Sequence, residues 1–114
     1  MAAVPEQVAR LRSPEEPTRH AAVQQLRELC LPKTDRCVEH RLEVGNHGGI
    51  ELMVQMLESA NGDVQRCTCL ALNEACLKNP ANSRTFQTCG AIQRVMRILE
   101  SVRAIARTHP PIHH

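Results

Sequence analysis

One twelve-residue pattern occurs twice in the chain, at residues 48–59 and again at residues 90–101, an offset of 42 residues. The residues identical in both copies form the pairs Gly48/Gly90, Ile50/Ile92, Leu57/Leu99, Glu58/Glu100 and Ser59/Ser101. Helix-length segments that recur with such a period are typical of arrays in which each unit buries its apolar side only against its neighbours. The repetition therefore predicts an all-α array and favours a binding scaffold over an enzyme.

Three segments show the periodicity of amphipathic helices, because apolar or small residues recur in them at steps of three and four. These stripes are Ile50, Met53, Val54 and Leu57; Val64, Cys67, Thr68, Ala71, Leu72, Ala75 and Cys76; and Ile92, Val95, Met96, Leu99 and Val102. Asn61-Gly62-Asp63 supplies turn and cap residues before the second helix. Asn79-Pro80 ends that helix, since proline disfavours helix at the residue before it.

The N-terminal third of the chain follows the same scheme at an offset of 46 residues. Val4, Val8 and Leu11 correspond to Ile50, Val54 and Leu57, and Ala22, Leu26, Leu29 and Cys30 correspond to Thr68, Leu72, Ala75 and Cys76. We therefore predict one repeat domain at residues 4–104, with units at about 4–46 and 47–89 and a partial unit at 90–104. Shorter helices are expected at 37–44 and 81–88, with Phe86 filling the core in the second. Residues 105–114 are predicted to be a disordered tail, because two prolines prevent the helix from continuing.

The composition excludes several classes of function. Phe86 is the single aromatic residue and the net charge is only +2, so the chain lacks both the base-stacking platforms and the basic stripe of a nucleic-acid binder. Its longest apolar runs fall short of the roughly 18 residues that cross a bilayer. The N-terminus lacks the basic and apolar regions of a secretory signal. We expect neither nucleic-acid nor membrane binding.

Six cysteines in a chain without a visible secretory signal predict cytoplasmic thiols rather than disulfides. A C-x-x-C pair is missing, so the cysteines are expected to pack as small apolar residues, with no metal and no cofactor. The alternative is a redox or metal module that uses Cys67, Cys69, Cys76 and Cys89. The chain also lacks the common catalytic motifs, which argues against an enzyme.

The order of the segments resembles the armadillo repeat. The residues that carry the resemblance are Asn79-Pro80-x-Asn82-x-Arg84-x-Phe86, Gly90-Ala91-Ile92, Val95-x-x-Ile98-Leu99, Asp63-Val64-Gln65-Arg66 and Ala71-Leu72-Asn73. Together they match a short first helix, a glycine-initiated second helix and a long third helix, over about residues 4–102. The resemblance implies an armadillo-like α-solenoid, a right-handed superhelix whose third helices line a concave groove that binds extended peptides.

The groove that the resemblance implies is lined by His20, Gln24 and Glu28 of one third helix and by Asp63, Arg66, Leu70 and Glu74 of the next. The tryptophan–asparagine ladder of nuclear-import receptors is replaced here by Gln24/Glu28 and Leu70/Glu74. Glu28 and Glu74 are equivalent, so they make the expected floor acidic. Two interpretations stay open: an acidic pair for a Lys or Arg of a partner, and a solvated helix face.

The last unit lacks its third helix, so the stripe on its second helix should be incompletely covered. We expect Val95, Ile98, Leu99 and Val102 to form this uncovered C-terminal face. The chain should then pack on another protein, self-associate through its C-terminal helix, or belong to a large assembly, for example a cytoskeletal or ciliary one. A truncated form of a longer array explains the missing helix equally well.

These observations predict a non-enzymatic scaffold or adaptor for other proteins in the cytoplasm, built as a small structural subunit. The alternative is a transport adaptor that binds peptides through the concave groove.

Overall fold

The computed structural model describes residues 3–108, and every regular element in that range is a helix. The helices are α1 (Val4–Arg10), α2 (Glu16–Cys30), α3 (Cys37–Asn46), α4 (Gly49–Met56), α5 (Gly62–Cys76), α6 (Pro80–Thr88) and α7 (Ala91–Thr108). The predicted all-α fold is confirmed.

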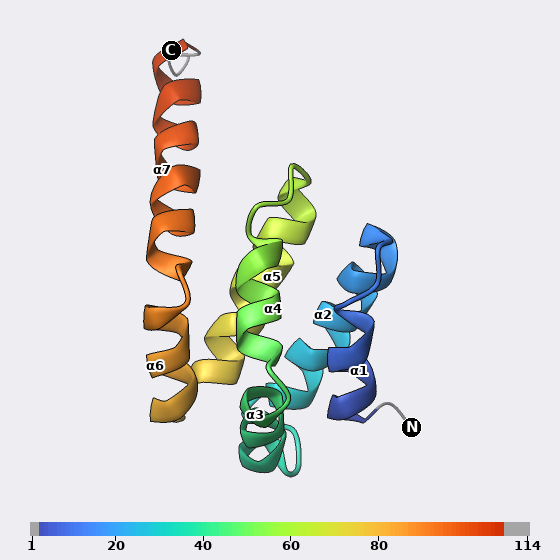
Figure 1. Ribbon diagram of the computed structural model, residues 1–114. Coiled ribbons are helices and arrows are strands. Elements are labelled where there is room, and N and C mark those ends of the chain that lie inside the picture. Colours follow the sequence, from blue (N-terminus) through green and yellow to red (C-terminus); the bar gives the residue numbers. More distant parts are fainter. Residues whose placement is uncertain (1–2, 109–114) are drawn as a thin grey trace.

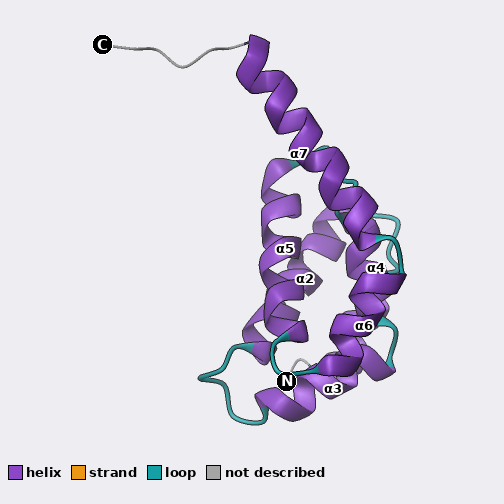
Figure 2. Cartoon of the chain, turned by 90° about the vertical axis from the view of Figure 1, so that its left-hand side faces the viewer, coloured by secondary structure: helices purple, strands orange, loops and turns teal. Residues whose placement is uncertain are grey.

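The helices follow one another across the molecule in chain order, with α1 and α2 on one side and α6 and α7 on the other (Figure 1). The most extensive packing joins α2 to α5, and α5 also packs against α4. Helix α7 packs against α6 and α4. Its C-terminal half extends beyond the rest of the molecule (Figure 2), so the end of α7 has little of the body beside it.

Helices at equivalent positions, meaning positions related by the offsets of 42 or 46 residues, begin at closely corresponding residues, although α7 has 18 residues and α4 has 8. Helices α2 and α5 each have 15 residues and begin 46 residues apart. Helices α4 and α7 begin 42 residues apart, each directly after a glycine. Gly48 and Gly90 have φ values of 79° and 90°, a left-handed conformation that glycine adopts without the penalty that a Cβ brings. This conformation accounts for the repeated glycine.

The core is formed mainly by the apolar stripes that the sequence predicts in the N-terminal third, at residues 50–57 and at residues 64–76. The core residues are Val4, Val8 and Leu11 near α1; Ala22, Val23, Leu26 and Cys30 of α2; Ile50, Met53, Val54, Met56 and Leu57 in and after α4; and Val64, Ala71, Leu72 and Ala75 of α5. Val44 and Ala91 complete the cluster. Phe86 is only half-buried at the edge of this core, so the prediction that it fills the core holds in part.

The C-terminal boundary differs from the prediction. Helix α7 continues to Thr108, so the expectation of a disordered tail from residue 105 is wrong for residues 105–108. Alanine and arginine in this stretch are strong helix formers, and Pro110 disfavours helix directly only at the residue before it. Residues 109–114 lie outside the described part of the chain.

Buried or half-buried polar side chains bind the carbonyl groups at the C-terminal ends of α2 and α5. Arg41 of α3 donates to the Cys30 carbonyl from Nε and Nη2, at 3.2 and 2.9 Å. At the equivalent positions, Ser83 Oγ donates to the Cys76 carbonyl at 3.3 Å. Asn82 Nδ2 donates to the Ala75 carbonyl at 2.9 Å and to the Arg41 carbonyl at 2.8 Å. Asn82 therefore ties α6 to both α3 and α5.

We expect Asn82→Ala to lower the free energy of unfolding by about 2 kcal/mol, because two carbonyl oxygens lose a donor in a buried site. The measurement is urea unfolding followed by circular dichroism. The matched control is Asn73→Ala on the exposed face of α5, which should change the stability by no more than about 0.5 kcal/mol. Equal effects of the two substitutions would contradict this account of Asn82.

Candidate functional site

The first candidate site is a hollow of about 500 Å³ between α2 and α5. Six of the seven predicted groove residues line it: His20, Gln24 and Glu28 from α2, and Asp63, Arg66 and Leu70 from α5. Steps of about four residues place each set along one side of its helix, and the packing of α5 on α2 brings the two sides together.

The charges in this hollow are balanced rather than acidic. Glu28 and Asp63 line it together with Arg27 and Arg66. Arg66 pairs with Asp63 at 3.1 Å, but both side chains are more than 70% exposed, so water screens the pair and it adds little stability. The expectation of an acidic floor is therefore wrong. Sequence reasoning missed Arg27 because it followed only the row at His20, Gln24 and Glu28.

Glu74, the seventh predicted residue, does not line the hollow. It is half-buried, and within the described structure its Oε2 is buried without a hydrogen-bond partner. The hollow therefore contains Glu28 without Glu74, and the expected acidic pair does not form in it. Equivalence in the repeat placed these residues on corresponding helices, but it did not fix how far each lies from solvent.

The second candidate site is the outer side of α7, where equivalent apolar positions differ sharply in burial. Ile50, Val54 and Leu57 are at most 1% exposed, whereas Ile92, Met96 and Leu99 are 53%, 51% and 45% exposed. Helix α4 has α5 packed beside it. In the described part of the chain α7 is followed by no such helix. The residues that are buried in α4 are consequently half-exposed in α7.

The predicted uncovered face of α7 divides into two rows. Val95 and Ile98 pack against the core, whereas Leu99 and Val102 are exposed. Of the four residues expected to be incompletely covered, Val95 and Ile98 are therefore half-buried rather than fully exposed. Successive residues turn by about 100° around a helix, so Val95 and Ile98 share the side that faces the body, while Leu99 continues the row of Ile92 and Met96.

Val102 continues the inward row of α7, yet it is 56% exposed. Here the cause is position along the helix, because the C-terminal half of α7 projects past the helices that cover Val95 and Ile98 (Figure 1). The exposed apolar surface thus combines one outward row with the projecting end of the inward row.

Two hollows adjoin α7 and share Leu57 as a lining residue. The first, of about 270 Å³, is largely apolar and is lined by Leu57, Cys69, Leu72, Asn73, Cys76, Phe86 and Val95. The second, of about 360 Å³, is lined by Leu57, Glu58, Gln65, Arg94, Arg97, Ile98, Ser101, Val102 and Ile105. We call the surface formed by these two hollows and by Ile92, Met96 and Leu99 the C-terminal face.

The C-terminal face carries positive charge. Helix α7 contains four arginines (residues 94, 97, 103 and 107) and one glutamate, Glu100. The Glu58 carboxylate, between α4 and α5, accepts a hydrogen bond from Arg97 at 2.8 Å and lies 3.5 Å from Arg94 Nε. One carboxylate therefore already bridges two arginines in the N-terminal half of α7.

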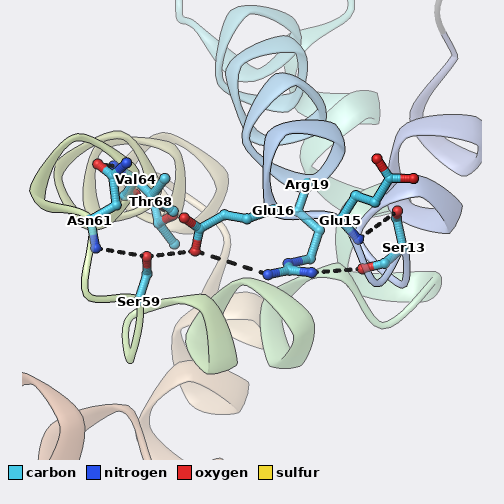
Figure 3. A network of polar contacts seen from close by, with 8 residues as sticks. All are labelled: Ser13, Glu15, Glu16, Arg19, Ser59, Asn61, Val64 and Thr68. Atoms are coloured by element: carbon cyan, nitrogen blue, oxygen red, sulfur yellow. Dashed lines mark hydrogen bonds and ion pairs between the residues drawn. The ribbon is translucent and has the colours of Figure 1, made fainter.

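A polar network joins the start of α2 to the start of α5 (Figure 3). Ser59 Oγ accepts a hydrogen bond from the Asn61 N–H at 3.1 Å and donates to Glu16 Oε2 at 2.7 Å. Ser13, 46 residues earlier, accepts in the same way from the Glu15 N–H at 3.1 Å. The repeated serine thus stabilises the turn that precedes each long helix. Its role is structural.

The six cysteines are free thiols. Burial raises the pKa of Cys30 to about 12 and that of Cys76 to about 11. Cys69 is exposed, so apolar packing does not describe all six. Within residues 3–108, no three His, Cys, Asp or Glu side chains gather where they could hold a metal ion.

No helix in the described range combines the length and the apolarity that crossing a bilayer requires.

Compared with protein-family models, curated proteins and solved structures, the chain matches none of them.

We expect Cys30 to resist alkylation by iodoacetamide at pH 8 in the folded protein, while the exposed Cys69 reacts faster than Cys30. The raised pKa keeps Cys30 as the unreactive thiol, and its burial excludes the reagent. Peptide mass spectrometry after timed labelling measures the order, with labelling in 8 M urea as the control in which both cysteines react. Labelling of Cys30 as fast as Cys69 in the folded protein would show that this part of the core opens readily.

The same thiol gives the stability a pH dependence. The folded pKa of Cys30 lies above the ordinary value of 9.0, so the stability that its neutral form contributes is complete below about pH 9 and is lost between pH 9 and 12. We expect the free energy of unfolding to fall less between pH 7 and pH 10.5 in Cys30→Ala than in the unsubstituted protein. Urea unfolding of both proteins at the two pH values measures this difference. Parallel losses in the two proteins would contradict this contribution.

Proposed function

We propose that the chain is a non-enzymatic protein–protein interaction module, built as a short armadillo-like α-solenoid, which binds its partner through the C-terminal face. The observation that carries this proposal is the burial contrast between Ile50, Val54 and Leu57 and their equivalents Ile92, Met96 and Leu99. Single exposed apolar residues are normal on protein surfaces, but a contiguous row marks an interaction site.

The magnitude of the apolar term supports this choice of face. Burial of a whole aliphatic side chain contributes about 1.5–3 kcal/mol, and three half-exposed side chains therefore represent about 2–4 kcal/mol. The remaining exposed large apolar residues are fewer on each helix: Val38 and Leu42 lie on α3, Leu70 lies on α5 and Leu77 directly follows α5. The C-terminal face thus has the most concentrated tendency to associate.

The proposal includes a cytoplasmic location and a role as a structural subunit of a larger assembly. Six free cysteines are typical of a reducing compartment. A subunit role follows from the same face, because a protein that leaves such a row exposed is stabilised when it is built into a complex.

Leu99→Glu should remove the partners that co-purify with the tagged chain from cells, because a charge on this row opposes burial. Leu42→Glu is the matched control, since Leu42 is similarly exposed but lies on α3. Quantitative mass spectrometry compares the partner sets, and circular dichroism checks that both variants keep their helix content. A partner set that survives Leu99→Glu unchanged would exclude the C-terminal face.

The hollow between α2 and α5 supports a second candidate function, the binding of an extended basic peptide. Both helices contribute to it, and it presents Glu28 and Asp63 to a bound chain. The double substitution Glu28→Lys and Asp63→Lys should weaken binding of a labelled lysine-rich decapeptide by about tenfold or more at low salt.

Fluorescence anisotropy measures this peptide binding. The control changes the charge equally but elsewhere, with Glu6→Lys and Asp35→Lys, both of which are exposed and do not line the hollow. Equal loss of binding in the two double variants would mean that overall charge, rather than this hollow, attracts the peptide.

A further inference from the structure

The packing of α5 on the rest of the molecule provides a template for what is missing beside α7. Helix α2 packs against α1 and α5, and α5 packs against α4 and α2. Each of these two 15-residue helices therefore lies beside the shorter helix that precedes it in the chain. Helix α7 is equivalent to α4, and within the described residues it has no helix in the position that α5 takes beside α4.

The outer side of α5 is likewise without a further helix packed on it in the described part of the chain. Val23, Leu26 and Cys30 of α2 are buried, and α5 packs against this helix. Their equivalents 46 residues on are Cys69, Leu72 and Cys76, which all line the apolar hollow beside α7. Cys69 is exposed and Cys76 is half-buried. The surface that α2 offers to α5 is thus offered again by α5, and within the described residues it is covered only in part, because Leu72 is buried while Cys69 is exposed.

We propose that the cradle between α5 and α7 binds an amphipathic helix of another protein, about 15 residues long, whose apolar face is flanked by acidic side chains. This inference rests on the proposed function and specifies its partner. The length is that of α2 and α5. Packing of an amphipathic helix into an apolar groove is a common mode of recognition.

The charges of α7 select an acidic occupant. Four arginines against one glutamate give this helix a net charge of +3, and Glu58 already shows that a carboxylate binds there, through Arg94 and Arg97. Carboxylates along the edge of an incoming helix would meet the remaining positive charge, which speeds association and selects against basic partners.

A second copy of the chain is a poorer occupant for two reasons. Two α7 helices placed side by side would bring like charges together, which opposes association. In addition, the helices with the right length and apolar pattern, α2 and α5, already pack against each other within the copy. Neither could enter the cradle without leaving its own place in the fold.

Two synthetic peptides with the sequence of α5 test the proposal, each with Cys67→Ala and Cys76→Ala. The acidic peptide also carries Arg66→Glu, Cys69→Glu and Asn73→Glu, and the basic peptide carries Cys69→Lys and Asn73→Lys. Fluorescence anisotropy measures the binding of each labelled peptide to the full chain. We expect the acidic peptide to bind at least about tenfold more tightly than the basic one, and its affinity to fall as salt rises.

Two variants of the chain locate the binding. Leu99→Glu should weaken binding of the acidic peptide by about tenfold or more, while Leu42→Glu on α3 should leave it unchanged. If Leu99→Glu leaves the affinity for the acidic peptide unchanged, the peptide displaces α5 or binds elsewhere. This result would overturn the proposal. Equal binding of the two peptides, or no binding of either, would overturn it too.

Sedimentation equilibrium of the chain alone completes the experiment. A monomer supports an occupant from another protein. A dimer that Leu99→Glu dissociates would identify a second copy as the occupant and overturn the proposal. Failure of the acidic-helix proposal is distinguishable from failure of the proposed function. If Leu99→Glu still removes the cellular partners while neither peptide binds, the C-terminal face binds something other than an acidic helix.

Discussion

The packing of α5 against α2 and α4 is the interaction on which the rest of the structure depends. It buries the apolar sides of three helices at once, including Val23 and Leu26 of α2 and Val64 and Leu72 of α5. The core contains no fully buried aromatic side chain, so its stability rests on close contact between aliphatic and small residues. Each helix is stable because a neighbouring helix covers it, and within residues 3–108 the cover of α7 is incomplete.

Polar contacts fix how these helices meet. Ser13 and Ser59 stabilise the turns before α2 and α5, while Arg41 and Ser83 hold the carbonyls at the opposite ends of the same helices. Helix ends leave carbonyl and N–H groups without partners in their own helix, and polar side chains satisfy some of them here. The two long helices are therefore held at both ends in matching ways, which makes their surfaces comparable position by position.

The sequence predicted the helices well because their apolar periodicity is strong. The stripes at Ile50 and at Val64 were placed correctly, and six of the seven predicted groove residues do line one hollow. Periodicity shows which residues share a side of a helix, but it does not show what lies against that side. It therefore could not separate the covered Val95 from the exposed Leu99 on α7.

Because periodicity does not show what lies against a helix, the sequence and the structure also differ at other residues. The equivalence of Glu28 and Glu74 in sequence did not reveal that one lines the hollow while the other is partly withdrawn from solvent. Arg27 was missed because a residue next to the selected row also reaches the hollow. The sequence predicts that the repeat domain ends at residue 104 and that a disordered tail follows, whereas α7 continues to Thr108. A proline disfavours helix directly only at the residue before it, so Pro110 does not prevent helix in residues 105–108.

Amide hydrogen exchange of the isolated chain tests the central claim most directly, because protection reports how firmly each helix is covered. The account predicts strong protection in α2, α4 and α5, and rapid exchange in the half of α7 beyond Leu99. Protection of that half as strong as that of α5 would show that α7 is already covered in solution. It would contradict the claim that this helix is left open for a partner.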